Sequence, residues 1–167
     1  MDTDTFWGLL ADARARAYTE EQQAEKLTDL LAALPPEEIV AFERRYSGYH
    51  DRAYTWRLWA AGYVVNGGCS DDGFHYFRDW LIARGRACYE QALADPDGLA
   101  DMFWAEGELA EAESVGYAAY HAYERVTGVE LPCPAVAAGT AHTGPAGEPW
   151  EEEDLPGLLP KLSARFG

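Results

Sequence analysis

A long repeat of large apolar residues in the first half of the chain limits the fold more than any other feature of the sequence. These residues recur at alternating spacings of three and four: Ile39, Phe42, Tyr46, Tyr49, Ala53, Trp56, Ala60 and Tyr63. That spacing places them on one face of an α-helix. We therefore expect one long helix over residues 36–66, bent or loosened at Ser47-Gly48, because glycine inside a helix costs about 1 kcal/mol relative to alanine. We interpret the aromatic stripe as core packing rather than as the lining of a ligand site.

Helical spacing and helix-boundary signals continue on both sides of that stretch. Thr19 precedes Glu20-Glu21-Gln22, a capping-box pattern whose side chains satisfy free backbone N–H groups at a helix start. The helix that follows Thr19 has to end at Pro35-Pro36, because the residue before a proline is driven out of the α region. The other expected helices cover residues 4–18, 70–84, 86–94, 99–104 and 107–126.

The pattern changes after residue 128, where prolines, glycines and alanines follow one another without a period. The last residues become amphipathic again, and we expect them to dock on the folded body. No alternating strand pattern is present. We therefore predict an all-α fold, a single helical domain of about six helices with an irregular C-terminal extension. Its parts are the helical domain (1–128), a Pro/Gly/Ala-rich loop (129–149) and the docking C-terminal segment (150–167).

The charge balance narrows the classes of partner. The 167 residues carry a formal net charge of −16, which disfavours nucleic acid, because phosphate contacts need clustered Lys and Arg. A basic partner or a cation suits such a surface, and solubility alone is the alternative explanation. No apolar run approaches a membrane span and no signal peptide is recognised. The three widely spaced cysteines suggest neither a disulfide framework nor a zinc site, so we expect a cytoplasmic protein.

The stretch VVNGGCSDDGFHYFRDWLIARGR, residues 64–86, is the strongest candidate for a site. Asn66-Gly67-Gly68 is typical of a helix end, and Ser70-Asp71-Asp72 is typical of a helix start. Paired glycines also allow a ligand to approach the backbone. The stretch is therefore either a tight helix joint or the edge of a binding site. Its candidate ligand-binding residues are Asn66, Ser70, Asp71, Asp72, Arg78 and Arg86.

The helix after this joint places Asp72, His75 and Asp79 on one face, at spacings of three and four residues. Two oxygens and an imidazole nitrogen can surround a cation or orient a general base. A solvated helix face is the simpler interpretation. The catalytic candidates are Asp71, Asp72 and His75. We expect no resident metal or cofactor; Asp72, His75 and Asp79 are the candidates should a cation bind. The arginines nearby either pair with carboxylates or anchor a ligand anion.

An acidic run follows these helices and is a candidate docking face for a basic partner. A solvated rim is the alternative interpretation. Its members are Asp95, Asp97, Asp101, Glu106, Glu108, Glu111 and Glu113.

Three segments together resemble one family: Phe6-Trp7, LWAAGYVVNGGCSDDGFHYFRDWLIARGRACYEQAL from Leu58 to Leu93, and DPDGLAD from Asp95 to Asp101. They are similar to the uncharacterised bacterial family known as domain of unknown function 4240, over residues 1 to about 126. The later segment PAGEPWEEEDLPGLLPKLSARF resembles the one that closes members of that family. The resemblance implies no activity. It directs attention to the signature residues Gly67, Gly68, Ser70, Asp71, Asp72, Phe77, Arg78, Trp80, Gly85 and Arg86.

Two functions stay open at this point. The first is a helical binding or accessory module that acts through an acidic surface on a basic protein partner. The second is a small-ligand or metal-assisted enzyme with a site for a small polar ligand at the Gly67–Asp72 joint. Whether the protein is an enzyme is left undecided by these patterns.

Overall fold

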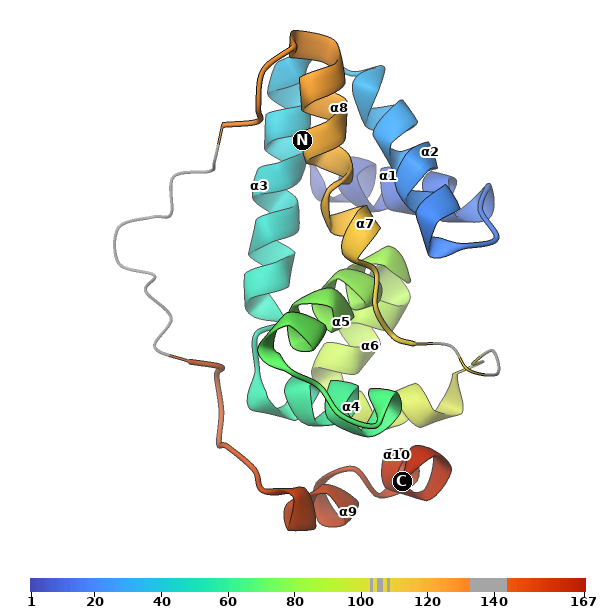
Figure 1. The fold of residues 1–167 in the computed structure, drawn as a ribbon, viewed down its shortest axis with the longest axis vertical. Helices are drawn as coiled ribbons and strands as arrows, with labels where there is room; N and C mark the ends of the chain where they lie inside the picture. Colours follow the sequence, from blue (N-terminus) through green and yellow to red (C-terminus); the bar gives the residue numbers. More distant parts are fainter. Residues whose placement is uncertain (103, 105–106, 108, 133–143) are drawn as a thin grey trace. The chain divides into compact units, whose positions relative to one another are not determined.

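The computed structural model describes residues 1–102, 104, 107, 109–132 and 144–167 (Figure 1). In that part of the chain the secondary structure is helical, and one isolated β-bridge joins Thr55 to Ala146. The prediction of an all-α fold with a C-terminal extension is confirmed. The described helices are α1 (Thr3–Ala15), α2 (Glu20–Ala32), α3 (Pro36–Arg52), α4 (Trp56–Asn66), α5 (Asp71–Ala83), α6 (Arg86–Ala94), η1 (Pro96–Asp101), α7 (Glu113–Gly116), α8 (Ala118–Thr127), η2 (Glu152–Asp154), α9 (Leu155–Leu158) and α10 (Pro160–Phe166).

The chain divides into two compact units. Unit 1 comprises Met1–Asp51 and Ala112–His142, and unit 2 comprises Arg52–Glu111 and Thr143–Gly167. None of the described helices is long and apolar enough to span a bilayer.

Unit 1 packs its aromatic residues between α1 and α3. The Phe6 ring lies 4.8 Å from Phe42 and 5.1 Å from Tyr49. In the same unit α2 packs against α8, where the Thr28 hydroxyl donates to the Ala118 carbonyl at 3.4 Å. Fully buried aliphatic side chains complete the core: Leu10, Leu27, Leu31 and Ile39. The aromatic stripe of α3 is therefore core, as the sequence pattern predicts.

The prediction of one helix over residues 36–66 is wrong. Helix α3 ends at Arg52, α4 begins at Trp56, and Gly48 lies inside α3. Thr55 between the two helices is extended (φ −132°, ψ 147°), and its hydroxyl accepts the backbone N–H of Leu58 at 3.2 Å. An N-cap threonine satisfies a free backbone donor at a helix start, so a new helix can begin here despite the continuous apolar stripe.

Two further helix boundaries differ from the prediction. The helix expected over residues 107–126 is instead two helices, α7 and α8, which begin at Glu113 and end at Thr127 before the left-handed Gly128. The short helix expected over residues 99–104 is the 3₁₀-helix η1, which begins earlier because Pro96 is suited to a first helical position. Of the expected loop 129–149, residues 133–143 lie outside the described residues, and the others carry no helix.

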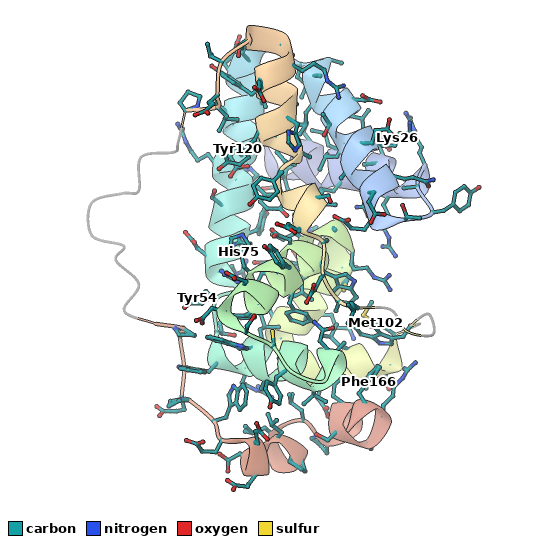
Figure 2. All side chains as sticks on the ribbon, in the orientation of Figure 1. Lys26, Tyr54, His75, Met102, Tyr120 and Phe166 are labelled. Carbon is teal, nitrogen blue, oxygen red and sulfur yellow. The ribbon has the colours of Figure 1, made fainter. Side chains whose placement is uncertain are left out.

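Unit 2 is built on α5, whose aromatic residues stack in a row. Phe74 lies 4.9 Å from Trp59, Trp80 lies 5.8 Å from Phe77, and Trp80 stacks on Trp104 at 4.9 Å. Other fully buried side chains fill the unit: Leu58, Leu81, Ile82, Tyr89, Leu99, Leu159 and Leu162. The last two come from the C-terminal extension, which is therefore part of the core of unit 2. Phe166 at its end (labelled in Figure 2) makes a T-shaped contact with Trp104, with the ring centres 5.3 Å apart.

Candidate functional site

The joint between α4 and α5 is shaped by backbone requirements. Gly67 is left-handed (φ 66°), and Gly68 has a φ of 134°, in a region that side-chain-bearing residues rarely adopt. The Gly68 N–H donates to the Tyr63 carbonyl at 2.8 Å, which closes the end of α4. Ser70 caps α5 through its hydroxyl, which accepts the Gly73 N–H at 3.1 Å. Helix-end chemistry therefore explains both glycines and the serine.

The segment around Ala110 covers the joint between α4 and α5. The Ala110 N–H donates to Asn66 Oδ1 at 2.9 Å, and the indole N–H of Trp59 donates to the Cys69 carbonyl at 3.0 Å. Asn66 Nδ2 is buried without a hydrogen-bond partner among the described residues. These contacts give Asn66 and the Cys69 backbone structural roles.

The Cys69 thiol is protonated at neutral pH. Burial, together with the negative charges of Glu111 and Asp71, raises the pKa of Cys69 to about 12. Glu111 is close, because a methyl group built on Gly73 would lie 3.7 Å from its Oε1. A thiol in this setting is a poor nucleophile at neutral pH.

The face of α5 that carries Asp72, His75 and Asp79 is only partly solvated. His75 Nε2 lies 3.7 Å from Asp79 Oδ2, and the side chain of Asp79 is 3% exposed against 56% for His75. Asp71 and Asp72 are exposed in the first turn, where the helix dipole favours acids. The structure thus brings His75 and Asp79 together and leaves Asp72 in solvent. The interpretation as a solvated face is wrong for Asp79, because the helix turns that side chain inward.

The signature arginines have different environments. The Arg78 side chain is buried. Its guanidinium lies 4.7 Å from the centre of the Tyr54 ring (labelled in Figure 2) and 5.0 Å from the centre of the Phe74 ring. Its Nε–H donates to the Phe74 carbonyl at 3.3 Å. Such cation–π contacts stabilise a desolvated arginine. Arg86 pairs with Glu90 at 2.8 Å on the surface of α6. The expected pairing with a carboxylate therefore holds for Arg86.

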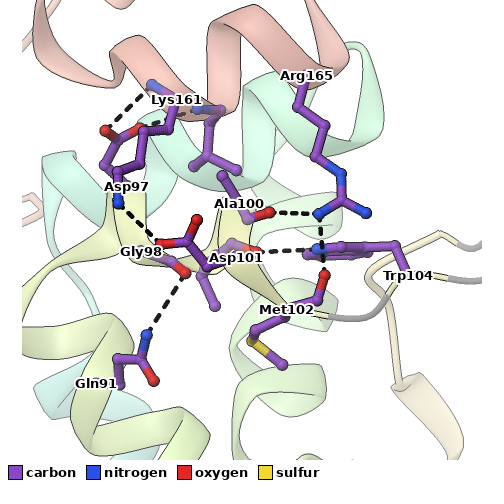
Figure 3. Close-up of polar contacts among 11 residues, drawn as sticks. Gln91, Asp97, Gly98, Ala100, Asp101, Met102, Trp104, Lys161 and Arg165 are labelled. Atoms are coloured by element: carbon purple, nitrogen blue, oxygen red, sulfur yellow. Dashed lines mark hydrogen bonds and ion pairs between the residues drawn. The ribbon is translucent and has the colours of Figure 1, made fainter.

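The acidic run 95–113 does not form one solvated surface. Asp97 is buried, and its carboxylate accepts the backbone N–H groups of Lys161 at 3.2 Å and Leu162 at 2.9 Å (Figure 3). Asp101 pairs with the Lys161 ammonium at 2.8 Å. The interpretation of Asp97 as part of a solvated rim or docking face is therefore wrong, because this carboxylate caps α10.

The rest of the run is divided as well. Glu111 is half-buried beside the joint, and Glu113 begins α7 in unit 1. Glu106 and Glu108 lie outside the described residues.

The C-terminal extension carries a denser group of acids, which we call the acidic strip. Its five side chains are all exposed: Glu148, Glu151, Glu152, Glu153 and Asp154. The strip is held on unit 2, because the Trp150 indole N–H donates to the Trp56 carbonyl at 2.8 Å. Ala146 accepts from the Trp56 N–H at 3.0 Å and donates to the Tyr54 carbonyl at 2.9 Å. The run Glu151-Glu152-Glu153 is the signal of this strip in the sequence.

A groove of about 770 Å³ borders the acidic strip. Its lining comes from α4, the end of α6, η1, residues 146–150 and α9. Most of the lining is apolar, including Leu58, Leu93 and Leu158, and Leu158 is 39% exposed. Glu148 and Asp154 also line the groove. We call it the α4–α9 groove.

A second groove of about 640 Å³ lies along α4, α9 and α10. Tyr63 lines it and donates its hydroxyl hydrogen to Glu152, a bond that raises the pKa of Tyr63. This member of the acidic strip is thus engaged with unit 2.

Unit 1 holds a separate titratable group, the buried carboxyl of Glu43. The Ser47 hydroxyl donates to Glu43 Oε1 at 2.9 Å. Burial raises the pKa of Glu43 to about 7, although the hydroxyls of Ser47 and Tyr120 lower it in part (Tyr120 is labelled in Figure 2). Glu43 therefore titrates near neutral pH.

The α4–α5 joint, the α5 helix and residues 95–101 all lie in the part of the chain that a protein-family model matches. A family model described as "Protein of unknown function (DUF4240)" matches residues 1–125. The chain belongs to the DUF4240 family. The match confirms the resemblance seen in the signature residues, and the acidic strip lies C-terminal to the part matched by the DUF4240 model. Neither a curated protein nor a solved structure matches the chain.

Proposed function

We propose that this protein is a binding module that takes a basic protein partner on its acidic strip. The observation that carries the proposal is the placement of the strip. Five exposed carboxylates within seven residues are fixed to a folded unit by the Trp150–Trp56 hydrogen bond and the Thr55–Ala146 bridge. Fixed charges of one sign raise the local concentration of an oppositely charged partner and steer its approach.

The net charge of −16 supports a basic protein partner and disfavours nucleic acid. We also propose a cytoplasmic location, which the three widely spaced cysteines support. The alternative of a small-ligand or metal-assisted enzyme at the Gly67–Asp72 joint has less support, because helix capping and segment packing account for the contacts there.

The test is fluorescence anisotropy with a labelled lysine-rich peptide at low salt. The variant Glu148→Gln/Glu153→Gln removes two charges whose side chains make no hydrogen bond or ion pair among the described residues. We expect a Kd about 2- to 30-fold weaker, since two exposed charge pairs contribute about 0.2–1 kcal/mol each and 1.4 kcal/mol is about tenfold in Kd. The matched control is Glu25→Gln/Glu37→Gln, which removes two exposed charges from unit 1.

An equal loss in the control variant would mean that net charge alone attracts the peptide. No binding to the unmodified protein at low salt would also contradict the proposal.

A further inference from the structure

The α4–α9 groove adds an apolar surface directly beside the acidic strip. Leu93 contributes from the helical body and Trp150 from the extension, whereas Leu58 borders the groove but is itself buried. Leu158 on α9 leaves 39% of its side chain in solvent. Apolar area of this kind gains free energy when a partner covers it, at about 25 cal/mol per Å².

Charges are distributed unevenly among the residues that line this groove. Glu148 and Asp154 belong to the acidic strip, whereas Arg57 is the one basic residue among the described residues of the lining. An occupant that places apolar side chains in the groove therefore has carboxylates within reach of its own basic residues.

We propose that the α4–α9 groove receives the apolar side chains of a basic amphipathic segment of a partner protein. This inference rests on the proposed function and names the kind of segment that binds. Two observations select that occupant. The lining is mostly apolar beside an acidic strip, and a volume of about 770 Å³ accommodates several side chains. Amphipathic segments commonly bind by placing apolar anchors in such a groove, with complementary charge at its edge.

The experiment compares two peptides of equal length and charge, one with alternating lysine and leucine and one with serine in place of every leucine. On the unmodified protein we expect the leucine peptide to bind at least 10-fold more tightly. Leu158→Ser should reduce that preference roughly 5-fold, because the groove loses part of the apolar surface that the leucines of the peptide contact. It should leave the Kd of the serine peptide unchanged, and thermal unfolding checks that the variant is folded.

The matched control is Val126→Ser, which removes an apolar side chain that is 43% exposed on α8 of unit 1. It should not change the preference. Arg57→Gln should strengthen the binding of both peptides about 2-fold, because a like charge near the lysines is removed.

The outcomes separate the two proposals. If both peptides bind equally, or if Leu158→Ser leaves the preference intact, the groove is not the anchor site and the acidic strip alone attracts the peptides. An equal effect of Val126→Ser would also overturn the inference. If neither peptide binds, the proposed function itself fails.

Discussion

Replacing the buried Glu43 with glutamine should stabilise the protein at neutral and alkaline pH but not at acid pH. The pKa of Glu43 is about 7 in the folded chain, against 4.5 for an ordinary glutamate. A raised carboxyl pKa means that folding favours the protonated form. Stability is therefore fully present below pH 4.5, falls as the pH rises, and levels off above pH 7.

The size of this effect follows from the same two values. A difference of about 2.5 pKa units, at 1.36 kcal/mol per unit, amounts to roughly 3 kcal/mol of lost stability above pH 7. About 2 kcal/mol of that loss falls between pH 5.5 and 8.5, a range that avoids precipitation near the sequence pI of 4.4. Glutamine imitates the protonated carboxyl and still accepts the Ser47 hydrogen bond, so Glu43→Gln should escape the loss.

The assay is urea unfolding of the unmodified protein and of Glu43→Gln at several pH values from 5.5 to 8.5. The difference in unfolding free energy between the two should grow by about 2 kcal/mol across that range. Glu37→Gln, an exposed position on the same helix, is the control and should give a difference that changes little with pH. A difference that does not change with pH for Glu43→Gln would contradict a raised pKa of Glu43 in the folded protein.

Three other predictions concern the joint and the extension. Asp97→Ala removes the acceptor of two backbone N–H groups on α10. It should lower the free energy of unfolding, measured in urea, by about 2–4 kcal/mol. A change below about 0.5 kcal/mol would contradict the capping role of Asp97. Asn66→Ala leaves the Ala110 N–H without its acceptor and should cost about 1–2 kcal/mol in the same assay. Because burial raises its pKa to about 12, Cys69 should react with iodoacetamide at pH 8 at least 10-fold more slowly than in the urea-unfolded chain. Mass spectrometry of the labelled peptide measures the rate, and equal rates would contradict a buried Cys69 thiol.

Local chemistry made several elements predictable from the sequence. Thr19 and Ser70 begin helices as their residue types predict, because a capping hydroxyl acts on donors only a few residues away. The same holds for the Gly67 left-handed end of α4. The start of α4 is harder to predict although Thr55 is also a capping residue, because the apolar stripe continues on both sides of it without a change of spacing.

Long-range contacts account for what the sequence could not predict. Asp97 lies in an acidic run that suggests a solvated surface, yet its partners are 64 and 65 residues away on α10. Asp79 lies on a polar helix face but is turned inward. In the candidate site, the sequence indicated the glycines and acids of the joint, but it could not show that Ala110 covers Asn66 or that Trp150 fixes the acidic strip.

Hydrogen–deuterium exchange of the whole protein, with and without the lysine–leucine peptide, is the most direct test of whether a basic segment binds at the acidic strip and the α4–α9 groove. We expect saturating peptide to slow exchange in residues 146–158, which carry the acidic strip and one side of the α4–α9 groove. Protection confined to unit 1, or no protection at saturating peptide, would contradict this expectation.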